Sequence, residues 1–273
     1  MEQTLSVERV DTVEIVTMNR PEVLNAIDAT MVAELSEHLD RCAADDDIRV
    51  VVLMGAGRAF SSGYDLRTLD DDATRLGPTK MFEYARYVHD FAEKIWRFRK
   101  PLIAATHGYC LGGAAEIAML CDLTITTESC VFGEPEVRFS SASPSLILPW
   151  LVPLKIAKEL LLTGATITAQ RALEIGMVNE VVPDGDLRAA ALRKAQVVAT
   201  VSPLCAQMHK KGINDMYETM GLLSSMRHHN VLAAMVDGTA TEEFRKFTEI
   251  SERDGLKAAL KWRDDQFKDL ENN

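Results

Sequence analysis

Short apolar stretches predict the strands of this protein. Leu5–Val10 and Val13–Met18 alternate apolar with polar residues, which predicts an antiparallel strand pair. Ile48–Met54 is a continuous apolar run rich in β-branched residues, as a buried strand should be, and Pro101–Thr106 predicts a second one. Shorter strands are predicted at Leu123–Thr127, Val131–Phe132 and Val178–Val182.

The segments between these strands show helical periodicity, and the C-terminal part of the chain shows only that pattern. Asp28 is placed to cap a helix that runs through Cys42, with Met31, Leu35 and Leu39 on one face. Further helices are predicted around Thr79–Phe98, from the capping residue Thr168 to Gly176, and from Asp186 to Ala199. After Ser202-Pro203 only helical periodicity remains. The chain is therefore predicted to be an α/β protein with a β/α core over residues 1–200 and a helical region over residues 201–273.

The composition excludes several classes of protein. Of the 273 residues 47% are apolar, which suits a globular core, and the net charge of −11 argues against a general nucleic-acid or anionic-membrane surface. The five cysteines form no C-x-x-C pair. The longest apolar stretch, Leu146 to Leu154, is too short to cross a membrane, and residues 1–15 lack a signal-peptide core. We expect a cytoplasmic protein with reduced cysteines and no membrane or nucleic-acid partner.

The first candidate for chemistry is the strand that ends in Gly55-Ala56-Gly57. A dinucleotide-binding fingerprint would need a third glycine at position 60, which is Phe60, followed by an amphipathic helix. The chain continues instead with the turn-like Ser61–Leu66. A nicotinamide oxidoreductase is therefore an outside alternative, and a strand that ends in a tight turn is the simpler interpretation.

The second candidate is the run from His107 to Glu116, which contains Gly112-Gly113 directly after a buried strand. A helix that begins near Gly113 would point free N–H groups and the positive end of its dipole at a ligand, which suits a developing oxyanion. Glu116 would then lie in the first helical turn. A glutamate is also a routine stabiliser of the dipole there, so its pattern alone does not assign it a catalytic role.

The third candidate is Glu134-Pro135-Glu136 on a predicted loop. Two carboxylates around a proline are either solvated surface charges or, since proline stiffens a loop, acids that are aimed inward. Composition leaves both interpretations open. The pair His228-His229 has no acid or cysteine at ligand spacing, so we expect a helix-surface pair and no metal site.

Taken together, these segments resemble one family. The runs that carry the resemblance are Asn19–Ala26, Phe60–Leu66, Gly108–Gly113, Phe132–Glu136, Leu162–Gly164, Ala169–Ala172 and Gly176–Asn179. In order and spacing they are similar to the crotonase (enoyl-CoA hydratase/isomerase) superfamily from about residue 5 to 270. The resemblance implies a spiral of ββα units that forms two roughly perpendicular sheets, followed by a C-terminal helical region that builds a homotrimer or a hexamer of two trimers.

The resemblance also implies a reaction and its residues. The backbone N–H groups of Tyr64 and Gly113 would form an oxyanion hole for an acyl-CoA thioester, and Glu116 and Glu136 match both glutamates of the hydratases. An enoyl-CoA hydratase is thus expected, with CoA as part of the substrate and no separate cofactor. An enoyl-CoA isomerase, an acyl-CoA thioester or C–C hydrolase, and a non-catalytic acyl-CoA-binding relative are the alternatives.

Substrate contacts follow from the same resemblance. CoA is expected along two loops, and the residues concerned are Leu24, Ala26, Ser61, Gly63, Asp65 and Leu66, with Arg20, Arg58 and Arg67 as candidates for the phosphates. The last helix, Gly255–Phe267 with Trp262, either closes over CoA or contributes to a trimer. The chain departs from the family after Glu136, where Val137–Ser145 contains no glycine and includes Pro144. Met208, Met216, Met220, Met226 and Met235 are interpreted as packing residues of the helical region.

Overall fold

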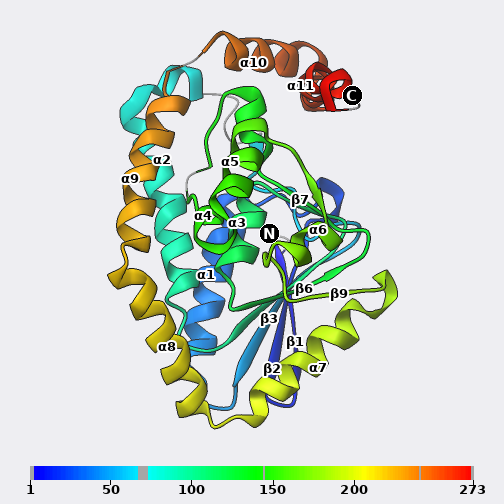
Figure 1. The fold of residues 1–273 in the computed structure, drawn as a ribbon, viewed down its shortest axis with the longest axis vertical. Helices are drawn as coiled ribbons and strands as arrows, with labels where there is room; N and C mark the ends of the chain where they lie inside the picture. The colour runs from blue at the N-terminus through cyan, green and yellow to red at the C-terminus, as the bar shows by residue number, and fades with distance from the viewer. Residues whose placement is uncertain (1–2, 67–72, 144, 240, 272–273) are drawn as a thin grey trace.

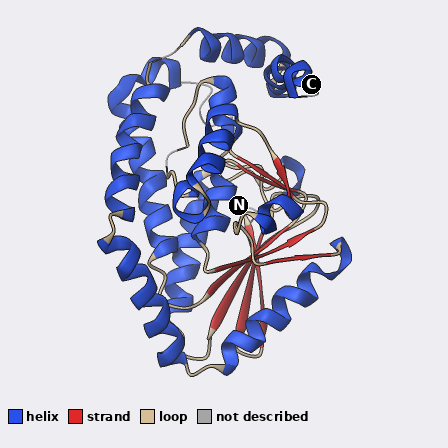
Figure 2. Cartoon of the chain, viewed as in Figure 1, coloured by secondary structure: helices blue, strands red, loops and turns tan. Residues whose placement is uncertain are grey.

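The chain folds into two sheets with helices packed around them (Figure 1). The computed structural model describes residues 3–66, 73–143, 145–239 and 241–271; Arg67 and Pro144, which the sequence pointed out, lie outside these residues. Figure 2 shows the strands gathered on one side of the molecule and a row of long helices on the other.

The larger sheet has the strand order β1-β2-β3-β4-β6-β9. Its β1–β2 pair is antiparallel and every following pair is parallel. The bounds are β1 Leu5–Val10, β2 Val13–Met18, β3 Val50–Gly55, β4 Leu102–Thr106, β6 Leu123–Thr127 and β9 Glu180–Val182. The smaller sheet pairs β7 (Val131–Gly133) with β5 (Tyr109–Leu111) in parallel and with β8 (Ile167–Thr168) antiparallel.

Alternation along the strands divides the core into two layers. On β3, Val50 and Val52 face helix α7 (Leu187–Thr200), while Val51 and Leu53 face the opposite cluster. Because successive side chains of a strand point to opposite faces, a strand covered on both sides is apolar throughout, as this one is. The predicted strands over Leu5–Val10, Val13–Met18 and Leu123–Thr127 are confirmed with the same bounds.

The remaining helices surround these sheets. Their bounds are α1 Ala29–Ala44, α2 Ala73–Trp96, α3 Gly113–Leu120, α4 Leu148–Leu151, α5 Leu154–Thr163, α6 Ala169–Glu174, α8 Pro203–Thr219, α9 Leu222–Asp237, α10 Glu242–Asp254 and α11 Leu256–Glu271, with 3₁₀ turns η1 Pro21–Val23, η3 Pro135–Phe139 and η4 Asp184–Asp186. The two predicted caps are confirmed: Asp28 accepts a hydrogen bond from Met31 N at 2.8 Å, and Thr168 accepts one from Arg171 N at 3.2 Å.

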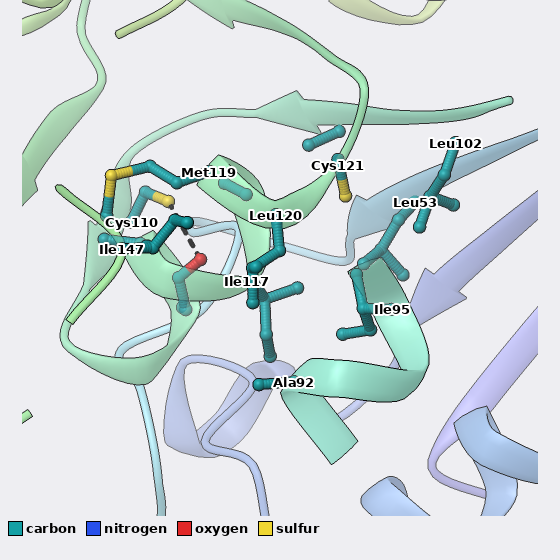
Figure 3. Close-up of a cluster of buried hydrophobic side chains, with 14 of the residues drawn as sticks. Leu53, Ala92, Ile95, Leu102, Cys110, Ile117, Met119, Leu120, Cys121 and Ile147 are labelled. Carbon is teal, nitrogen blue, oxygen red and sulfur yellow. Dashed lines mark hydrogen bonds between the residues drawn. The ribbon is translucent and has the colours of Figure 1, made fainter. Parts of the chain in front are cut away.

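Helix α3 is buried along its whole length. Figure 3 shows its Ile117 and Leu120 beside Ile95 of α2 and Leu53 of β3, all of them side chains of the main core. Burying a side chain of this size stabilises the fold by roughly 1.5–3 kcal/mol. The N-terminus of α3, and with it Gly113, is therefore anchored to the centre of the molecule.

From Pro203 onward the described residues form helices. Helix α9 packs along α2, and α10 and α11 form a pair at one end of the molecule (Figure 1). The interpretation of the methionines is wrong for four of the five: Met226 is buried, but Met208, Met216, Met220 and Met235 are exposed. None of the helices in the described part of the chain combines the length and apolar character that crossing a membrane requires.

Candidate active site

Two glycines shape the start of α3. Gly112 has φ +54° and ψ −132°, a conformation that side-chain-bearing residues rarely adopt, and its N–H donates to the Gly133 carbonyl at 2.8 Å. Its own carbonyl accepts from Ala115 N and Glu116 N, which begins the helix. As the first residue of α3, Gly113 has no intrahelical acceptor for its N–H, so this donor points out of the helix at its positive end.

A second chain segment brings another N–H to the same place. Gly63 has φ +96°, and a methyl group built on it would lie 2.8 Å from the Leu111 carbonyl oxygen and 3.4 Å from Gly113 N. Only a glycine permits this approach, and it brings Tyr64 beside Gly113. Among the described residues, neither Tyr64 N nor Gly113 N donates to a backbone carbonyl. The structure thus brings together the two predicted oxyanion donors.

The ring of Tyr64 covers Gly113. A methyl group on Gly113 would lie 2.2 Å from Cε2 of that ring, so the ring lies against the Gly113 backbone. Burial and the charge of Glu116 raise the pKa of the phenol well above its usual value, which keeps Tyr64 neutral. The tyrosine narrows the approach to the oxyanion donors without contributing a charge.

Glu116 lies in the first turn of α3, with its side chain facing the protein interior. The residue is 1% exposed, Oε1 accepts a hydrogen bond from Ser145 N at 2.8 Å, and buried Oε2 has no partner among the described residues. Burial, and then the charges of Glu134 and Glu136, raise the pKa of Glu116 well above its usual value. A glutamate that merely balanced the helix dipole would be solvated and ionised, so this position indicates a chemical role.

Glu136 approaches from η3 and lies over Gly112. A methyl group on Gly112 would be 2.3 Å from Glu136 Oε1, so the absent side chain leaves the space that the carboxylate occupies. Burial and the charge of Glu134 raise the pKa of Glu136 to about 8, and Arg263 partly opposes this. Its buried Oε2 also has no partner among the described residues. Glu136 therefore lies on the glycine turn that carries the predicted oxyanion donors, and Glu116 lies in the first turn of the helix that starts there.

A third glutamate belongs to the same cluster, although the family resemblance assigned a role only to Glu136 of the Glu134-Pro135-Glu136 candidate. Glu134 is 5% exposed, its Oε2 accepts a hydrogen bond from Ser143 Oγ at 2.5 Å, and its Oε1 has no partner among the described residues. Burial raises the pKa of Glu134 to about 7. The one signal in the sequence was that Glu134 and Glu136 flank the same proline, so that fixing one acid also fixes the other.

The stretches on either side of position 144, Ser140–Ser143 and Ser145–Leu146, hold these carboxyl groups, and α9 contacts the first of them. Asp237 of α9 accepts a hydrogen bond from Ala142 N at 3.3 Å, and burial raises the pKa of Asp237 to about 6. His229 of α9 is half-buried near the backbone of Ser143. The expectation of a helix-surface histidine pair is thus met by His228, which is exposed, but is wrong for His229.

The last two helices contact the site through η3. Phe139 of η3 stacks on Phe247 of α10, with ring centroids 4.9 Å apart, and Arg263 of α11 lies with its guanidinium carbon 5.9 Å from the Phe139 ring centroid. The Arg263 charge lowers the pKa of Glu136. Trp262 packs within the α10–α11 cluster, where Lys246 Nζ lies 5.3 Å from its ring centroid. No feature of the sequence indicated Arg263.

The two loops predicted to bind CoA run side by side. Ser62 N donates to the Leu24 carbonyl at 3.0 Å and Asp65 N to the Ile27 carbonyl at 3.0 Å. The predicted contact residues are all on this pair of loops: Ala26, Ser61, Gly63 and Asp65 are buried, and Leu24 and Leu66 are partly exposed. Arg20 forms ion pairs at 3.2 Å with Asp28 and Asp65, so its guanidinium ties the loops together. Arg58 is exposed.

One buried group of metal-ligating types lies elsewhere, between β2 and α1. The ligand atoms of Glu14, His38 and Cys42 lie within 4.8 Å of one another. Arg41 Nη2 lies 3.0 Å from His38 Nδ1 and can only donate, so a neutral ring carries its proton on Nε2, 3.1 Å from Glu14. Burial raises the pKa of Cys42 to about 12. This arrangement is that of a buried His–Glu contact beside a protonated thiol.

Comparison with known proteins gives a consistent result. The sequence matches the enoyl-CoA hydratase/isomerase family over residues 8–266. It is 35% identical to (E)-benzylidenesuccinyl-CoA hydratase of Thauera aromatica, covering 86% of this chain and 91% of that protein, and 34% identical to 2,3-dehydroadipyl-CoA hydratase of Escherichia coli K12, covering 85% and 91%.

Solved structures agree on the fold. A crystal structure of an enoyl-CoA hydratase/isomerase from Xanthobacter autotrophicus Py2 superposes with a TM-score of 0.94 at 38% identity and covers 98% of this chain and 99% of that one. An enoyl-CoA hydratase of Mycobacterium smegmatis superposes with a TM-score of 0.88 at 26% identity, covering 97% and 94%. The predicted crotonase fold is confirmed, and the chain belongs to the enoyl-CoA hydratase/isomerase family.

Proposed function

We propose that the protein is an enoyl-CoA hydratase that adds water across the 2,3 double bond of a 2-enoyl-CoA thioester. One observation carries this proposal: Glu136 lies on the glycine turn that begins the helix of Glu116, and each glutamate has a buried carboxyl oxygen for which the described residues supply no partner, beside two backbone N–H groups that donate to no described carbonyl. An isomerase needs a single group to move one proton, whereas hydration needs a base for water and an acid for C2. The paired glutamates therefore favour hydration.

The backbone donors stabilise the charge that develops on the substrate. When water attacks C3, electron density moves to the thioester oxygen, and Tyr64 N–H and Gly113 N–H bind that oxygen as an enolate. A well-placed donor of this kind contributes about 3–4 kcal/mol to transition-state stabilisation. Because Gly113 begins a helix that is buried in the core, its N–H requires no reorganisation during the reaction.

Glu116 and Glu136 then move the protons. One carboxylate takes a proton from the attacking water, and the other carboxyl group delivers a proton to C2, so the pair holds the same number of protons before and after the reaction. An exposed glutamate would be ionised at neutral pH. The raised pKa of both groups therefore supplies the carboxylic acid that the second step needs.

The substrate is a CoA thioester, and we propose no separate cofactor. The relatives named above are hydratases of acyl-CoA thioesters with different acyl groups. The loops that contain Leu24, Ala26, Ser61, Gly63, Asp65 and Leu66 remain the proposed contacts for CoA. The altered segment Val137–Ser145 lies next to the glutamates, so it is the part of the chain that we expect to select the acyl group.

We also propose a homotrimer or a hexamer of two trimers, in the cytoplasm. Apolar residues along α8 and α9 support the assembly: Leu204, Met208, Ile213, Met216, Met220 and Met235 are exposed on the single chain. All five cysteines are free thiols, which supports a reducing compartment. Light scattering of the purified protein measures the assembly, and a monomeric mass at micromolar concentration would contradict it.

The function is tested with crotonyl-CoA by following the loss of the conjugated thioester absorbance and the mass of the product. We expect hydration by the wild type and a loss of roughly 10²-fold or more in kcat for Glu116→Gln and for Glu136→Gln. Glu128→Gln, an exposed glutamate on a turn, serves as the control and should keep wild-type activity. A product of unchanged mass would identify an isomerase, and binding of CoA esters without turnover of any enoyl-CoA would contradict catalysis.

A further inference from the structure

The carboxyl cluster contains one acid more than hydration requires. Glu134 is only 5% exposed, although a glutamate without a role would gain solvation by turning outward. It is also oriented: one oxygen is fixed by Ser143, and the other is buried without a partner among the described residues. A buried acid that is half satisfied in this way calls for a specific explanation.

The geometry links Glu134 to Glu116 through a single short segment. Ser143 Oγ donates to Glu134 Oε2 at 2.5 Å, and two residues later Ser145 N donates to Glu116 Oε1 at 2.8 Å. Ser145 also has a buried hydroxyl with no partner among the described residues. Because only one residue separates Ser143 from Ser145 in the sequence, the position of Ser143 limits where the N–H that holds Glu116 can lie.

The segment itself is conformationally constrained. Ser140 has φ +63° and Leu146 has φ +34°, and a bulky residue such as leucine persists at positive φ only where its surroundings impose it. On the outer side this backbone is held by α9, where Asp237 accepts a hydrogen bond from Ala142 N. On the inner side this backbone is held by Glu134, through Ser143, and by Glu116, through Ser145. Glu134 is thus one of the groups that hold this backbone in its strained form.

The charges facing the pair come from several elements. Glu136 of η3 and the phenols of Tyr64 and Tyr84 of α2 interact electrostatically with Glu116. Asp237 of α9 and Arg263 of α11 act on Glu136, and His229 of α9 lies near the backbone of Ser143. Among the carboxylates, Glu134 acts on Glu116 more strongly than Glu136 does. Arg263 acts mainly on Glu136, so it does not cancel the effect of Glu134 on Glu116.

We propose that Glu134 is a positioning residue for Glu116: through Ser143 it fixes the segment that binds Glu116, and through its charge it keeps a proton on Glu116. The proposal rests on the hydratase function only in that Glu116 must be a catalytic group. Because two buried carboxyl groups this close resist ionising together, the ionised Glu134 leaves Glu116 as the acid that stays protonated.

The first test measures the titration of Glu116 directly and needs no activity. Carboxyl-carbon NMR of the whole protein labelled with ¹³C-glutamate is recorded against pH for the wild type, Glu134→Gln and the control Glu128→Gln, with the Glu116 signal assigned from Glu116→Gln. We expect the Glu116 midpoint to fall by about one pH unit or more in Glu134→Gln and to stay in place in the control. An unchanged midpoint in folded Glu134→Gln would overturn the proposal.

The second test uses turnover and separates positioning from a merely structural role. In Glu134→Gln, kcat and kcat/KM for crotonyl-CoA should fall together by about tenfold or more, and the limb of the pH profile that reports Glu116 should move to lower pH, whichever duty Glu116 performs. A loss of activity without movement of that limb would reduce Glu134 to a structural residue. If the wild type hydrates no enoyl-CoA, the hydratase proposal fails, but the NMR titration still decides the relation between the two glutamates.

Ser143→Ala tests the link if Glu134→Gln does not fold. Loss of the hydroxyl removes a hydrogen bond that favours the charged form of Glu134, so the NMR midpoint of Glu134 should rise above its wild-type value. Without this hydrogen bond the backbone that binds Glu116 is held less firmly, so kcat should fall as well. A Glu134 midpoint and a kcat both equal to those of the wild type would overturn the proposed link.

Discussion

Replacing Gly112 by alanine tests whether the glycine turn exists to make room for Glu136. The new methyl group would lie 2.3 Å from Glu136 Oε1, whereas ordinary contacts begin at 3.4 Å. The carboxylate must therefore move by about 1 Å, and a misplacement of that size lowers the rate by about 10²-fold. Since the obstructing atom is the end of a flexible side chain, the fold accommodates the methyl group by displacing the catalytic acid.

The matched control is Gly176→Ala. Gly176 also has a positive φ, +79°, but nothing lies within 4 Å of its added methyl group. Both variants force alanine into a disfavoured backbone conformation, which destabilises each by about 1–3 kcal/mol. We thus expect similar losses of stability in the two proteins and a large loss of activity in only one of them.

The assay combines crotonyl-CoA turnover with denaturant unfolding of both variants. The expected result is that kcat falls by about 10²-fold in Gly112→Ala and is close to the wild-type value in Gly176→Ala. If Gly112→Ala keeps wild-type kcat while folded, Glu136 is not held where the structure places it. If both variants lose activity equally, backbone strain explains the loss, and the argument from the methyl contact is refuted.

Three further predictions follow from the charges of the site. Burial raises the pKa of Glu134 from 4.5 to about 7 and that of Glu136 from 4.5 to about 8. The folded state therefore binds more protons than the unfolded state, and this proton-linked contribution to the stability of the fold is lost as the pH rises from about 4.5 to about 8. Scanning calorimetry should show a pH-dependent loss of Tm that is smaller in Glu134→Gln than in the wild type, and an equal dependence in the two proteins would contradict the burial of Glu134. Arg263→Met should raise the pKa of Glu136 above about 8 and move its limb of the pH profile upward, whereas Arg253→Met, which removes an exposed arginine of the neighbouring helix, should not. Tyr64→Phe should leave kcat near the wild-type value because the donor is the backbone N–H, and a collapse of kcat would show that the phenol takes part in the reaction.

Regular elements could be predicted from the sequence because their patterns extend over whole turns or strands. The alternation in Val13–Met18 and the capping residue Asp28 each express a local rule, and both elements appear as expected. The strands β5 and β8 were missed because β5 lies in the run that was interpreted as a glycine turn, and β8 ends at Thr168, which was interpreted as a helix cap. The exposed methionines of α8 and α9 were misjudged because helical periodicity does not reveal which face lacks a neighbour.

The residues of the site also differ in how far the sequence could predict them. Gly112 and Gly113 could be read from the sequence because a backbone turn needs glycine, and Glu116 and Glu136 because the family resemblance marked them. Burial of Glu134 depends on Ser143, which tertiary folding brings to it, and Glu116 is held by a residue 29 positions away. Such contacts leave no periodic signal, so the sequence left open whether the carboxylates of Glu134-Pro135-Glu136 face solvent or the interior, and only the folded chain shows that Glu134 is buried.

The contact between α11 and η3 has a consequence for the order in which the enzyme matures. A chain emerges from the ribosome N-terminus first at about 5–20 residues per second, so the sheet and the glutamates are available to fold well before the last helix. Until α11 has emerged, Glu136 lacks the charge of Arg263 and Phe139 lacks its cover. A nascent chain therefore contains both glutamates before it contains the arginine that lowers the pKa of Glu136.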